Sequence, residues 1–171
     1  MAPPRCAEYI LEEFKGTPVA VKVIDSFDEI EKEFPCAAAV GRACKKVPRH
    51  LPRIVRLEYE GKEAEENLFF VGKGITYDTG GADVKYGGNM AGMKRDKGGA
   101  ATVAGFFRSL GELQPSRVHA VAYLAFVRNS IGSECYVADE VITARSGRRV
   151  LVVNTDAEGR MAMADLITKS K

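Results

Sequence analysis

The pattern of hydrophobic and polar positions divides the N-terminal part of the chain into short helices and strands. Residues 4–15 repeat apolar positions at helical spacing, and residues 19–25 have the composition of a strand. Ser26 followed by Glu29 has the spacing of a capping box and predicts a second helix. Because proline lacks a backbone N–H, that helix must bend or break at Pro35.

The middle of the chain continues this alternation. Residues 53–60 alternate like a half-exposed strand, and after a turn residues 67–72 read as a more deeply buried one. Residues 98–113 have helical spacing, and residues 117–127 are a strong strand candidate. The sequence therefore predicts long strands on both sides of a central helix.

A hairpin is predicted over residues 139–156, and its second strand leads into a final helix from about Glu158. Strands that alternate with helices are typical of an α/β domain with a largely parallel sheet. A chain of 171 residues is long enough for one domain with a substantial core and does not require two.

Composition and charge narrow the class of protein. Hydrophobic residues make up 46% of the chain, charged residues 28%, and the formal net charge is +2. Basic residues are interspersed with acids, which argues against nucleic acid as a partner. No segment approaches the roughly 18 apolar residues of a membrane span, so no membrane partner is expected.

The cysteines and the N-terminus favour a cytoplasmic location. The 4 cysteines show neither CxxC pairing nor zinc-finger spacing. Acidic residues interrupt the apolar pattern of residues 1–16, which do not read as a signal peptide. Free thiols in a reducing cytoplasm are the simplest interpretation.

Residues 72–101 combine many glycines with lysines and aspartates, and they connect the strand at 67–72 to the helix at 98–113. Ligands of open α/β sheets bind at such connections. The phosphate-binding patterns GxxxxGKS/T and GxGxxG are both absent, so nucleotide binding lacks specific support. The 2 histidines, His50 and His119, are far apart in the sequence, and His119, inside a strand, is more typical of a core position than of a metal ligand.

Carboxylates near the predicted strand ends favour a metal site instead. Asp78 is expected in the first turn after a strand, and Asp96 just before a helix. Asp156 and Glu158 are expected to end the last strand, where a spacing of two points both side chains the same way. These acids would repel one another unless cations neutralised them, and two divalent ions that share carboxylates would do so. The alternative is that they form turns and helix caps, with Asp156 capping the final helix.

Four short motifs then match one family in order and register. They are VGKGITYDTGG at 71–81, DVK at 83–85, NMAGMKRDKGGAA at 89–101 and NTDAEGR at 154–160. Together they resemble the signature of the leucyl aminopeptidase (cytosol aminopeptidase) family of metallo-exopeptidases. The usual family wording is close to VGKGITFDSGG, SIK, NMxxMRxDMGGAA and NTDAEGR. Weaker similarity extends over essentially the whole chain.

Carried over position by position, the resemblance implies two metal sites. Asp78 and Glu158 would bridge a tightly bound ion and an exchangeable one. The Lys73 amine would bind as a ligand after losing its proton, which two adjacent cations favour because like charge lowers its pKa. The tight site would comprise Lys73, Asp78, Asp96 and Glu158; the exchangeable site would comprise Asp78, Glu158 and Asp156 through its side chain and backbone carbonyl. Carboxylate-rich sites accept zinc, manganese, magnesium or cobalt.

The resemblance also implies catalytic and substrate-binding positions. Lys85 would stay charged and polarise the scissile carbonyl or stabilise the oxyanion. Arg160 would hold a bicarbonate ion that accepts the proton of the attacking water. Met93 would lie beside the pocket for the first side chain, and Asn154 near the substrate. The alternatives are a core-filling role for Met93 and a turn role for Asn154.

The glycines have an account in this reading. One segment must bring a lysine and two aspartates onto the same ions, which requires sharp turns and left-handed backbone angles. We expect these angles at Gly80–Gly81 and Gly98–Gly99 in particular. Gly87 and Gly88 would let the backbone reverse after Lys85.

The resemblance implies a metal-dependent aminopeptidase that releases N-terminal amino acids from peptides with a free N-terminus, by attack of a water activated by two metal ions. Its full-length relatives are expected to be homohexamers with a three-layer αβα catalytic domain, phosphorylase/hydrolase-like, on a mixed, largely parallel sheet. Residues 1–171 would be the N-terminal half of that catalytic domain, truncated at the C-terminus and with no separate N-terminal domain. The alternative is a truncated, catalytically inactive relative that acts as a metal- or subunit-binding module.

Two departures from the family wording lie near the predicted site. Asp83 stands where the family usually has serine, and Lys97 where it usually has a small apolar residue. A preference for leucine therefore does not follow from the resemblance.

Overall fold

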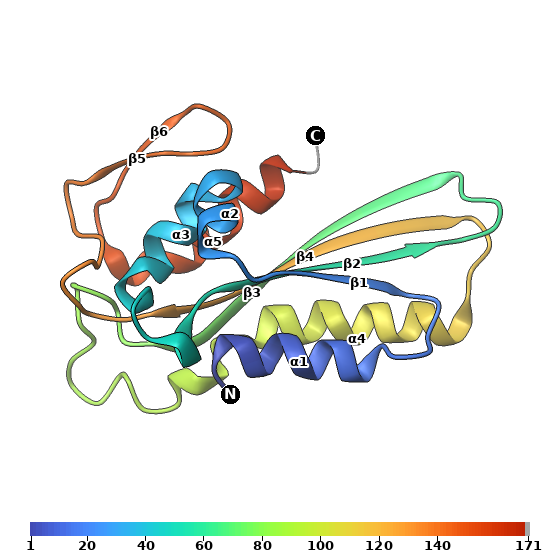
Figure 1. Cartoon of the computed structure of the whole chain (residues 1–171), viewed down its shortest axis with the longest axis horizontal. Coiled ribbons are helices and arrows are strands. Elements are labelled where there is room, and N and C mark those ends of the chain that lie inside the picture. The colour runs from blue at the N-terminus through green and yellow to red at the C-terminus, as the bar shows by residue number, and fades with distance from the viewer. Residues whose placement is uncertain (170–171) are drawn as a thin grey trace.

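The computed structural model describes residues 1–169 (Figure 1). The predicted helices and strands are present, although the strand predicted at 67–72 extends to Asp78 and the last strand ends at Leu151. In chain order they are α1 (Pro3–Glu13), β1 (Ala20–Ile24), α2 (Phe27–Glu33), α3 (Pro35–Gly41), β2 (Arg53–Glu60), β3 (Glu66–Asp78), α4 (Gly98–Leu113), β4 (Val118–Asn129), β5 (Val141–Thr143), β6 (Arg149–Leu151) and α5 (Glu158–Thr168). Short 3₁₀ turns lie at Arg42–Cys44, Pro48–His50, Met93–Arg95 and Thr155–Ala157.

A mixed four-stranded sheet in the order β1-β2-β4-β3 forms the middle layer. Helices α1 and α4 cover one face, and α2, α3 and α5 cover part of the other (Figure 1), which confirms the three-layer αβα architecture. Within the described residues, parallel pairing is confined to β3 and β4, while β1–β2 and β2–β4 are antiparallel. The sheet is thus mixed as expected, but its larger part here is antiparallel rather than parallel.

Successive side chains of β4 point to opposite faces of the sheet, so this apolar strand contributes to the hydrophobic core on each side. Ala125 and Val127 pack with the α2, α3 and α5 layer, whereas Leu124 and Phe126 pack with the α1 and α4 layer. A strand buried on both faces reads as a continuous hydrophobic run, which is what made it recognisable in the sequence. Fully burying a side chain such as Leu124 stabilises the fold by about 1.5–3 kcal/mol.

The helix signals near the N-terminus act as predicted. The Ser26 hydroxyl accepts a hydrogen bond from the Glu29 backbone N–H at 3.4 Å, and α2 starts at the next residue. Helix α2 ends at Glu33, and Pro35 opens α3 in a new direction.

Asp165 fastens α5 to two other elements. Its carboxylate is fully buried and accepts hydrogen bonds from the backbone N–H of Cys36 at 2.7 Å and of Arg145 at 2.8 Å. Cys36 lies in the first turn of α3, and Arg145 follows β5. One carboxylate therefore supplies partners for two backbone donors that burial would otherwise leave unpaired.

Three local expectations were wrong. Residues 67–72 are not deeply buried, because β3 is at an edge of the sheet and its first three residues are exposed. The strand also runs on through the start of the glycine-rich segment, so Asp78 is its last residue rather than part of a following turn. His119 is half-exposed, and its ring nitrogens lie 3.0 Å from Asn67 Oδ1 and 3.2 Å from Glu58 Oε1.

The predicted hairpin exists as β5 and β6, which form a separate two-stranded sheet. Asp156 and Glu158 do not lie in extended backbone: a 3₁₀ turn at Thr155–Ala157 precedes α5, whose first residue is Glu158. Their proximity therefore comes from a tight turn and not from strand alternation.

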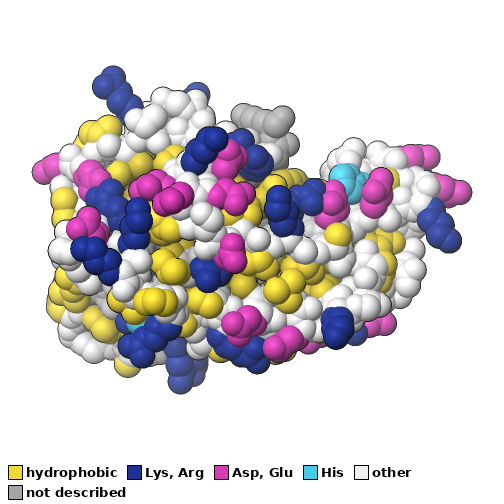
Figure 2. Space-filling view, in the orientation of Figure 1, with side chains coloured by type: hydrophobic (Ala, Val, Ile, Leu, Met, Phe, Trp, Pro, Cys, Tyr) yellow, Lys and Arg dark blue, Asp and Glu magenta, His cyan; other side chains and the backbone are white. Residues whose placement is uncertain are grey.

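The surface shows no concentration of one charge on the side seen in Figure 2, where basic and acidic side chains are interspersed. The cysteines Cys6, Cys36, Cys44 and Cys135 are free thiols, and the first three of them are buried. Within residues 1–169, no helix combines the length and the apolar character that crossing a membrane requires.

Candidate metal centre

The candidate site lies where β3 and β4 end, beside the start of α5. Lys73 and Asp78 come from β3, and a register shift between Ile75 and Asp78 separates them. The pairing moves from Ile75 opposite Val127 to Asp78 opposite Asn129, so β3 has one extra residue there. Because side chains alternate along a strand, this bulge turns Asp78 to the same face as Lys73.

The first half of the site is centred on the ammonium group of Lys73. Its Nζ donates a hydrogen bond to Asp96 Oδ1 at 2.9 Å and lies 2.8 Å from Asp96 Oδ2. The same nitrogen lies 2.9 Å from Glu158 Oε1. Lys73 thus bridges the segment that precedes α4 and the first residue of α5.

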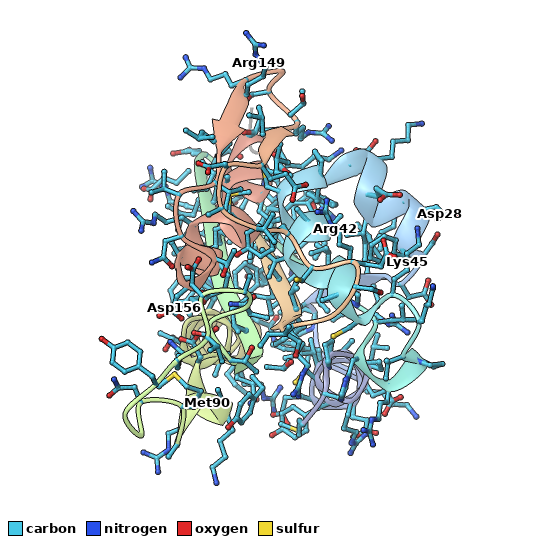
Figure 3. All side chains as sticks on the ribbon, turned by 90° about the vertical axis from the view of Figure 1, so that its left-hand side faces the viewer. Asp28, Arg42, Lys45, Met90, Arg149 and Asp156 are labelled. Carbon is cyan, nitrogen blue, oxygen red and sulfur yellow. The ribbon has the colours of Figure 1, made fainter. Side chains whose placement is uncertain are left out.

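The second half is centred on Lys85. Its Nζ lies 2.9 Å from Asp78 Oδ2 and 2.5 Å from Asp156 Oδ1. The structure therefore brings together all of the residues predicted as metal ligands, along with Lys85. Figure 3 shows Asp156 beside the glycine-rich loop that carries Met90.

The neighbouring carboxylates raise the pKa of both lysines. Burial lowers the pKa of Lys73, but hydrogen bonds to Asp96 and Glu158 outweigh it and raise the value overall. Burial likewise opposes the charged form of Lys85, and the adjacent Asp156 and Asp78 raise its pKa well above the usual range. Both lysines are cations at neutral pH in this arrangement. Loss of the Lys73 proton requires adjacent metal cations, and the neighbours of Lys73 in this structure are carboxylates.

The two bridging candidates differ. For Asp78, burial raises the pKa, but hydrogen bonds from Lys85, the Gly80 backbone N–H and Asn129 lower it overall. For Glu158, burial dominates and raises the pKa above its ordinary value. Glu158 is therefore an acid that the protein leaves incompletely compensated.

The donor set fits divalent cations. Oxygen atoms of Asp78, Asp156 and Glu158 lie within 4.8 Å of one another. Glu158 Oε2 is buried and accepts no hydrogen bond within the described part of the chain, whereas the buried Asp96 Oδ2 has the Lys73 ammonium 2.8 Å away. A buried acceptor without a partner costs about 1–3 kcal/mol, and more when it is charged. Carboxylate oxygens that converge in this way are the ligands that hard and borderline divalent ions prefer.

Hydrogen-bonding residues that the sequence did not single out organise the site. The fully buried Asn129 donates from Nδ2 to Asp78 Oδ1 at 2.8 Å and to the Thr155 carbonyl oxygen at 3.1 Å. The Tyr136 hydroxyl donates to the same carbonyl at 2.8 Å, and burial raises its pKa, which keeps it a donor. Asn129 ends a strand parallel to β3, so the strand-end rule could have identified it. Tyr136 carries no such signal.

The substrate-binding candidates border a cleft of about 630 Å³ beside the carboxylates. Met93 and Asn154 both line it, so the core-filling alternative for Met93 is wrong. Asn154 also has the alternative role of a turn residue, because its Oδ1 accepts a hydrogen bond from the Asp156 backbone N–H at 2.7 Å. The cleft is lined by Asp83, Val84, Lys85, Tyr86, Asn89, Met93, Asn154 and Asp156.

Arg160 lies in the first turn of α5 and is exposed. Within residues 1–169 its guanidinium makes no ion pair. The structure therefore leaves it free to meet an anion near the N-terminus of that helix.

Backbone geometry confirms one expected glycine pair and corrects the other. Gly80 and Gly81 have φ angles of +89° and +68°, and Gly87 and Gly88 are also left-handed. Gly98 and Gly99 are ordinary helical residues at the start of α4.

Two glycines matter for close approach instead. A Cβ atom at Gly99 would lie 3.1 Å from the Lys73 backbone nitrogen. A Cβ atom at Gly159 would lie 2.7 Å from Lys73 Cε. These positions let two helices start against the Lys73 backbone and side chain.

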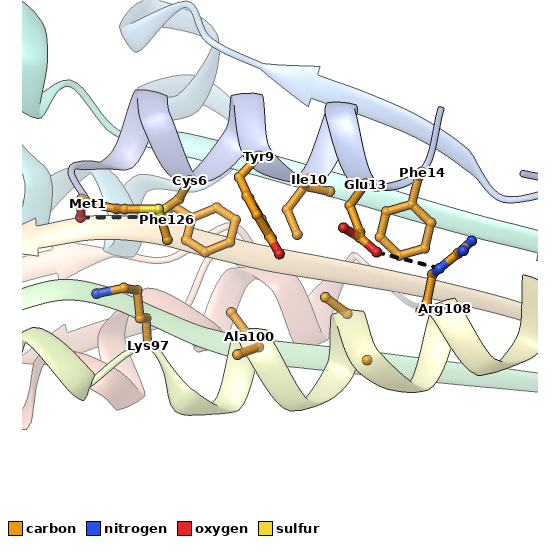
Figure 4. Close-up of a pocket in the computed structure, with 13 residues that line it drawn as sticks. Met1, Cys6, Tyr9, Ile10, Glu13, Phe14, Lys97, Ala100, Arg108 and Phe126 are labelled. Atoms are coloured by element: carbon orange, nitrogen blue, oxygen red, sulfur yellow. Dashed lines mark hydrogen bonds and ion pairs between the residues drawn. The ribbon is translucent and has the colours of Figure 1, made fainter. Parts of the chain in front are cut away.

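A second hollow, of about 350 Å³, lies between α1 and α4 (Figure 4). Its lining is largely apolar, with Ile10, Phe14 and Phe126 among the side chains, and an ion pair joins Glu13 and Arg108 at 3.5 Å. It is lined by none of the site carboxylates. The candidate metal centre therefore adjoins the cleft beside Lys85 and not this groove.

Known proteins resemble this α/β domain in sequence and in structure. Residues 1–171 match the catalytic domain of the cytosol aminopeptidase family. A Caenorhabditis elegans protein described as a "putative aminopeptidase" is 52% identical over 172 residues, which is 100% of this chain and 33% of that protein. The cytosol aminopeptidase from Coxiella burnetii has a TM-score of 0.91 at 35% identity, covering 99% of this chain and 36% of that one. The bottromycin maturation enzyme BotP in complex with Mn has a TM-score of 0.88 at 28% identity, covering 98% and 35% of the two chains.

The chain belongs to the cytosol aminopeptidase family. The resemblance carried by the motifs is thereby confirmed. The chain spans about one third of the length of the relatives that it matches.

Proposed function

We propose that this chain carries the metal centre of an aminopeptidase that releases N-terminal amino acids from peptides. The observation that supports this most directly is the convergence of carboxylate oxygens of Asp78, Asp156 and Glu158 within 4.8 Å of one another, with Glu158 Oε2 buried and accepting no hydrogen bond within the described residues. Membership of the aminopeptidase family supplies the reaction class, hydrolysis of a peptide bond next to a free amine.

Two divalent ions would be held by the residues that the motifs indicate. Asp78 and Glu158 would bridge them, because both are buried, each pairs with a different one of the two lysines, and their carboxylate oxygens lie within 4.8 Å of one another. Lys73 and Asp96 would complete one site, and Asp156 the other. Bound ions would supply Lewis acidity toward the scissile carbonyl and make water more acidic. The Mn complex of BotP favours manganese, and the same oxygen-rich donor set would also accept zinc, magnesium or cobalt.

Lys85 would stabilise the developing oxyanion. Its raised pKa keeps it cationic, and it lies at the border between the carboxylates and the cleft. A fixed positive charge there favours the tetrahedral transition state over the planar ground state.

Arg160 would bind bicarbonate as a proton acceptor. Its guanidinium is exposed, and the helix N-terminus nearby also favours an anion. The substrate would occupy the cleft, with Met93 beside its first side chain and Asn154 beside its backbone. Within a longer chain, residues 1–171 would form the first part of a catalytic domain of a cytoplasmic homohexamer.

The test is hydrolysis of a panel of aminoacyl anilides, leucyl anilide included, by the purified chain with added Mn²⁺ or Zn²⁺. Chelator treatment and Asp156→Asn serve as controls, and circular dichroism confirms that each protein is folded. Turnover that both controls abolish supports the proposal. A folded, metal-binding chain without turnover would instead identify a metal-binding module, and a folded chain that binds neither ion would overturn the proposed centre.

A further inference from the structure

Two segments that are far apart in the sequence meet at the proposed metal centre. One is the loop that follows Asp78 and carries Lys85; the other is the turn that carries Asp156 and Glu158. The ions alone need not hold these segments together, because a pair of reciprocal hydrogen bonds already joins them. Those bonds run between Asp83 and Thr155.

The geometry of this pair is that of a clasp, a name we use for the Asp83–Thr155 contact. The Thr155 backbone N–H donates to Asp83 Oδ2 at 2.7 Å, and the Asp83 backbone N–H donates to Thr155 Oγ1 at 2.8 Å. The Thr155 hydroxyl in turn donates to the Gly80 carbonyl oxygen at 2.6 Å. Each residue therefore contributes both backbone and side chain, which fixes distance and orientation together.

Every polar group of Thr155 takes part in a hydrogen bond. Its carbonyl oxygen accepts hydrogen bonds from Asn129 Nδ2 at 3.1 Å and from the Tyr136 hydroxyl at 2.8 Å. The residue is completely buried. Asn129 also binds Asp78, so the network closes on the same carboxylate from which the loop starts.

The position of the clasp in the chain indicates its purpose. Asp83 is two residues before Lys85, and Thr155 immediately precedes Asp156. Lys85 and Asp156 are themselves 2.5 Å apart at their charged ends. The contact between Asp83 and Thr155 therefore sets the distance between Lys85 and the carboxylates of the turn that carries Asp156.

We propose that Asp83 is a positioning residue of the metal centre: through Thr155 it holds the Lys85 loop and the Asp156–Glu158 turn in the geometry that binds metal. Asp83 acts through hydrogen bonds and not as a ligand, because its Oδ2 is directed at the Thr155 N–H. This inference rests on the proposed metal centre. Partners that orient ligands in this way typically change metal affinity by about 10–100-fold when removed.

Mn²⁺ binding to the whole chain, measured by titration calorimetry, tests the inference. We expect Asp83→Ala to weaken binding about 10-fold or more. Asp83→Asn should recover most of the affinity, because an amide oxygen can still accept from the Thr155 N–H. The matched control is Ser26→Ala, which also removes a side-chain acceptor from a backbone N–H but lies just before α2, away from the site. It should lower the melting temperature and leave Mn²⁺ affinity unchanged.

A second measurement does not depend on metal. Amide hydrogen exchange at Thr155 should become faster in Asp83→Ala and remain slow in Asp83→Asn and Ser26→Ala. Folded Asp83→Ala that binds Mn²⁺ like the unaltered chain would overturn the inference and leave the metal centre standing. Equal losses in the alanine and asparagine variants would also overturn it, because charge and not hydrogen bonding would then matter. If the unaltered chain does not bind Mn²⁺, the proposed centre fails, and unchanged Thr155 exchange would separately refute the clasp.

Discussion

Helix α5 buries two acids about two turns apart, and the protein treats them differently. Asp165 is 0% exposed and Glu158 is 1% exposed. Both oxygens of Asp165 accept backbone hydrogen bonds, from Cys36 and from Arg145. Glu158 has one oxygen beside Lys73 and one without a partner within residues 1–169.

This difference separates structural acids from acids reserved for chemistry. Hydrogen bonds from backbone N–H groups to a buried carboxylate offset the free-energy cost of removing that carboxylate from water. A buried carboxylate left with a free oxygen and a raised pKa keeps its binding capacity for something else. This is the difference expected if the start of α5 binds the proposed metal ions and its second half serves packing.

The largest expected effect is a loss of stability, and it tests the structural role of Asp165. Asp165→Ala would leave the backbone N–H groups of Cys36 and Arg145 without partners in a buried place, which should cost about 3–5 kcal/mol of unfolding free energy. Urea denaturation followed by circular dichroism measures this. Glu112→Ala, at an exposed ion pair with Arg108, is the control and should change stability by less than about 0.5 kcal/mol. A loss below about 1 kcal/mol for Asp165→Ala would contradict the structural assignment.

The next effect is a loss of Mn²⁺ affinity, and it tests the proposed role of Glu158 in metal binding. Glu158→Gln should weaken Mn²⁺ binding about 100-fold, which corresponds to about 2.7 kcal/mol. The same variant should be no less stable than the unaltered chain without metal, because it removes a buried and incompletely compensated charge. Calorimetric titration and urea denaturation give the two numbers. A variant that unfolds easily yet keeps its Mn²⁺ affinity would reverse the comparison.

A smaller effect concerns pH. Glu33 lies between Lys169 and Arg145, and these two cations lower its pKa to about 2. A lowered folded-state pKa contributes stability above the ordinary glutamate value, and that stability is lost as pH falls toward about 2. The carboxylate is partly exposed, so Glu33→Gln should cost about 1 kcal/mol or less at pH 7.

Unfolding free energies of both proteins between pH 2 and pH 7 test this. The difference between them should shrink steadily as the pH falls through the acid range. A difference that is independent of pH would show that the ion pairs to Glu33 contribute nothing.

The smallest effect on stability is expected at Arg160. Arg160→Ala removes an exposed side chain without a described ion pair and should change unfolding free energy by less than about 0.5 kcal/mol. If the guanidinium holds the proton acceptor, turnover should nevertheless fall by about tenfold or more. Added bicarbonate should stimulate the unaltered chain but not the variant. Equal stimulation of both would remove Arg160 from the mechanism.

Much of the fold could be predicted because its signals are local. Alternation along residues 53–60, the Ser26 cap and the break at Pro35 all lie within one element or its boundary. The ligand candidates were also recognisable, because their motifs occur in order and in register. The structure brings their side chains together as that resemblance implied.

What the sequence concealed depends on distant partners. The clasp joins Asp83 to Thr155, 72 positions away, and Asn129 reaches Asp78 from the neighbouring strand. Hydrophobic periodicity also cannot say whether a strand is central or at an edge, which is why residues 67–72 were assigned too much burial. The turn before α5 did leave a local signal, because Asn154 was also considered as a turn residue, and its side chain accepts a hydrogen bond from the Asp156 backbone N–H.

Gly159 affects the candidate site although it supplies no ligand atom. A methyl group there would meet the Lys73 side chain at 2.7 Å, and that flexible chain could move aside at little cost to folding. Its amine would then leave Asp96 and Glu158, so the loss would fall on binding. The glycine at this position therefore matters for the space that it leaves to the Lys73 side chain and not for any group that it contributes.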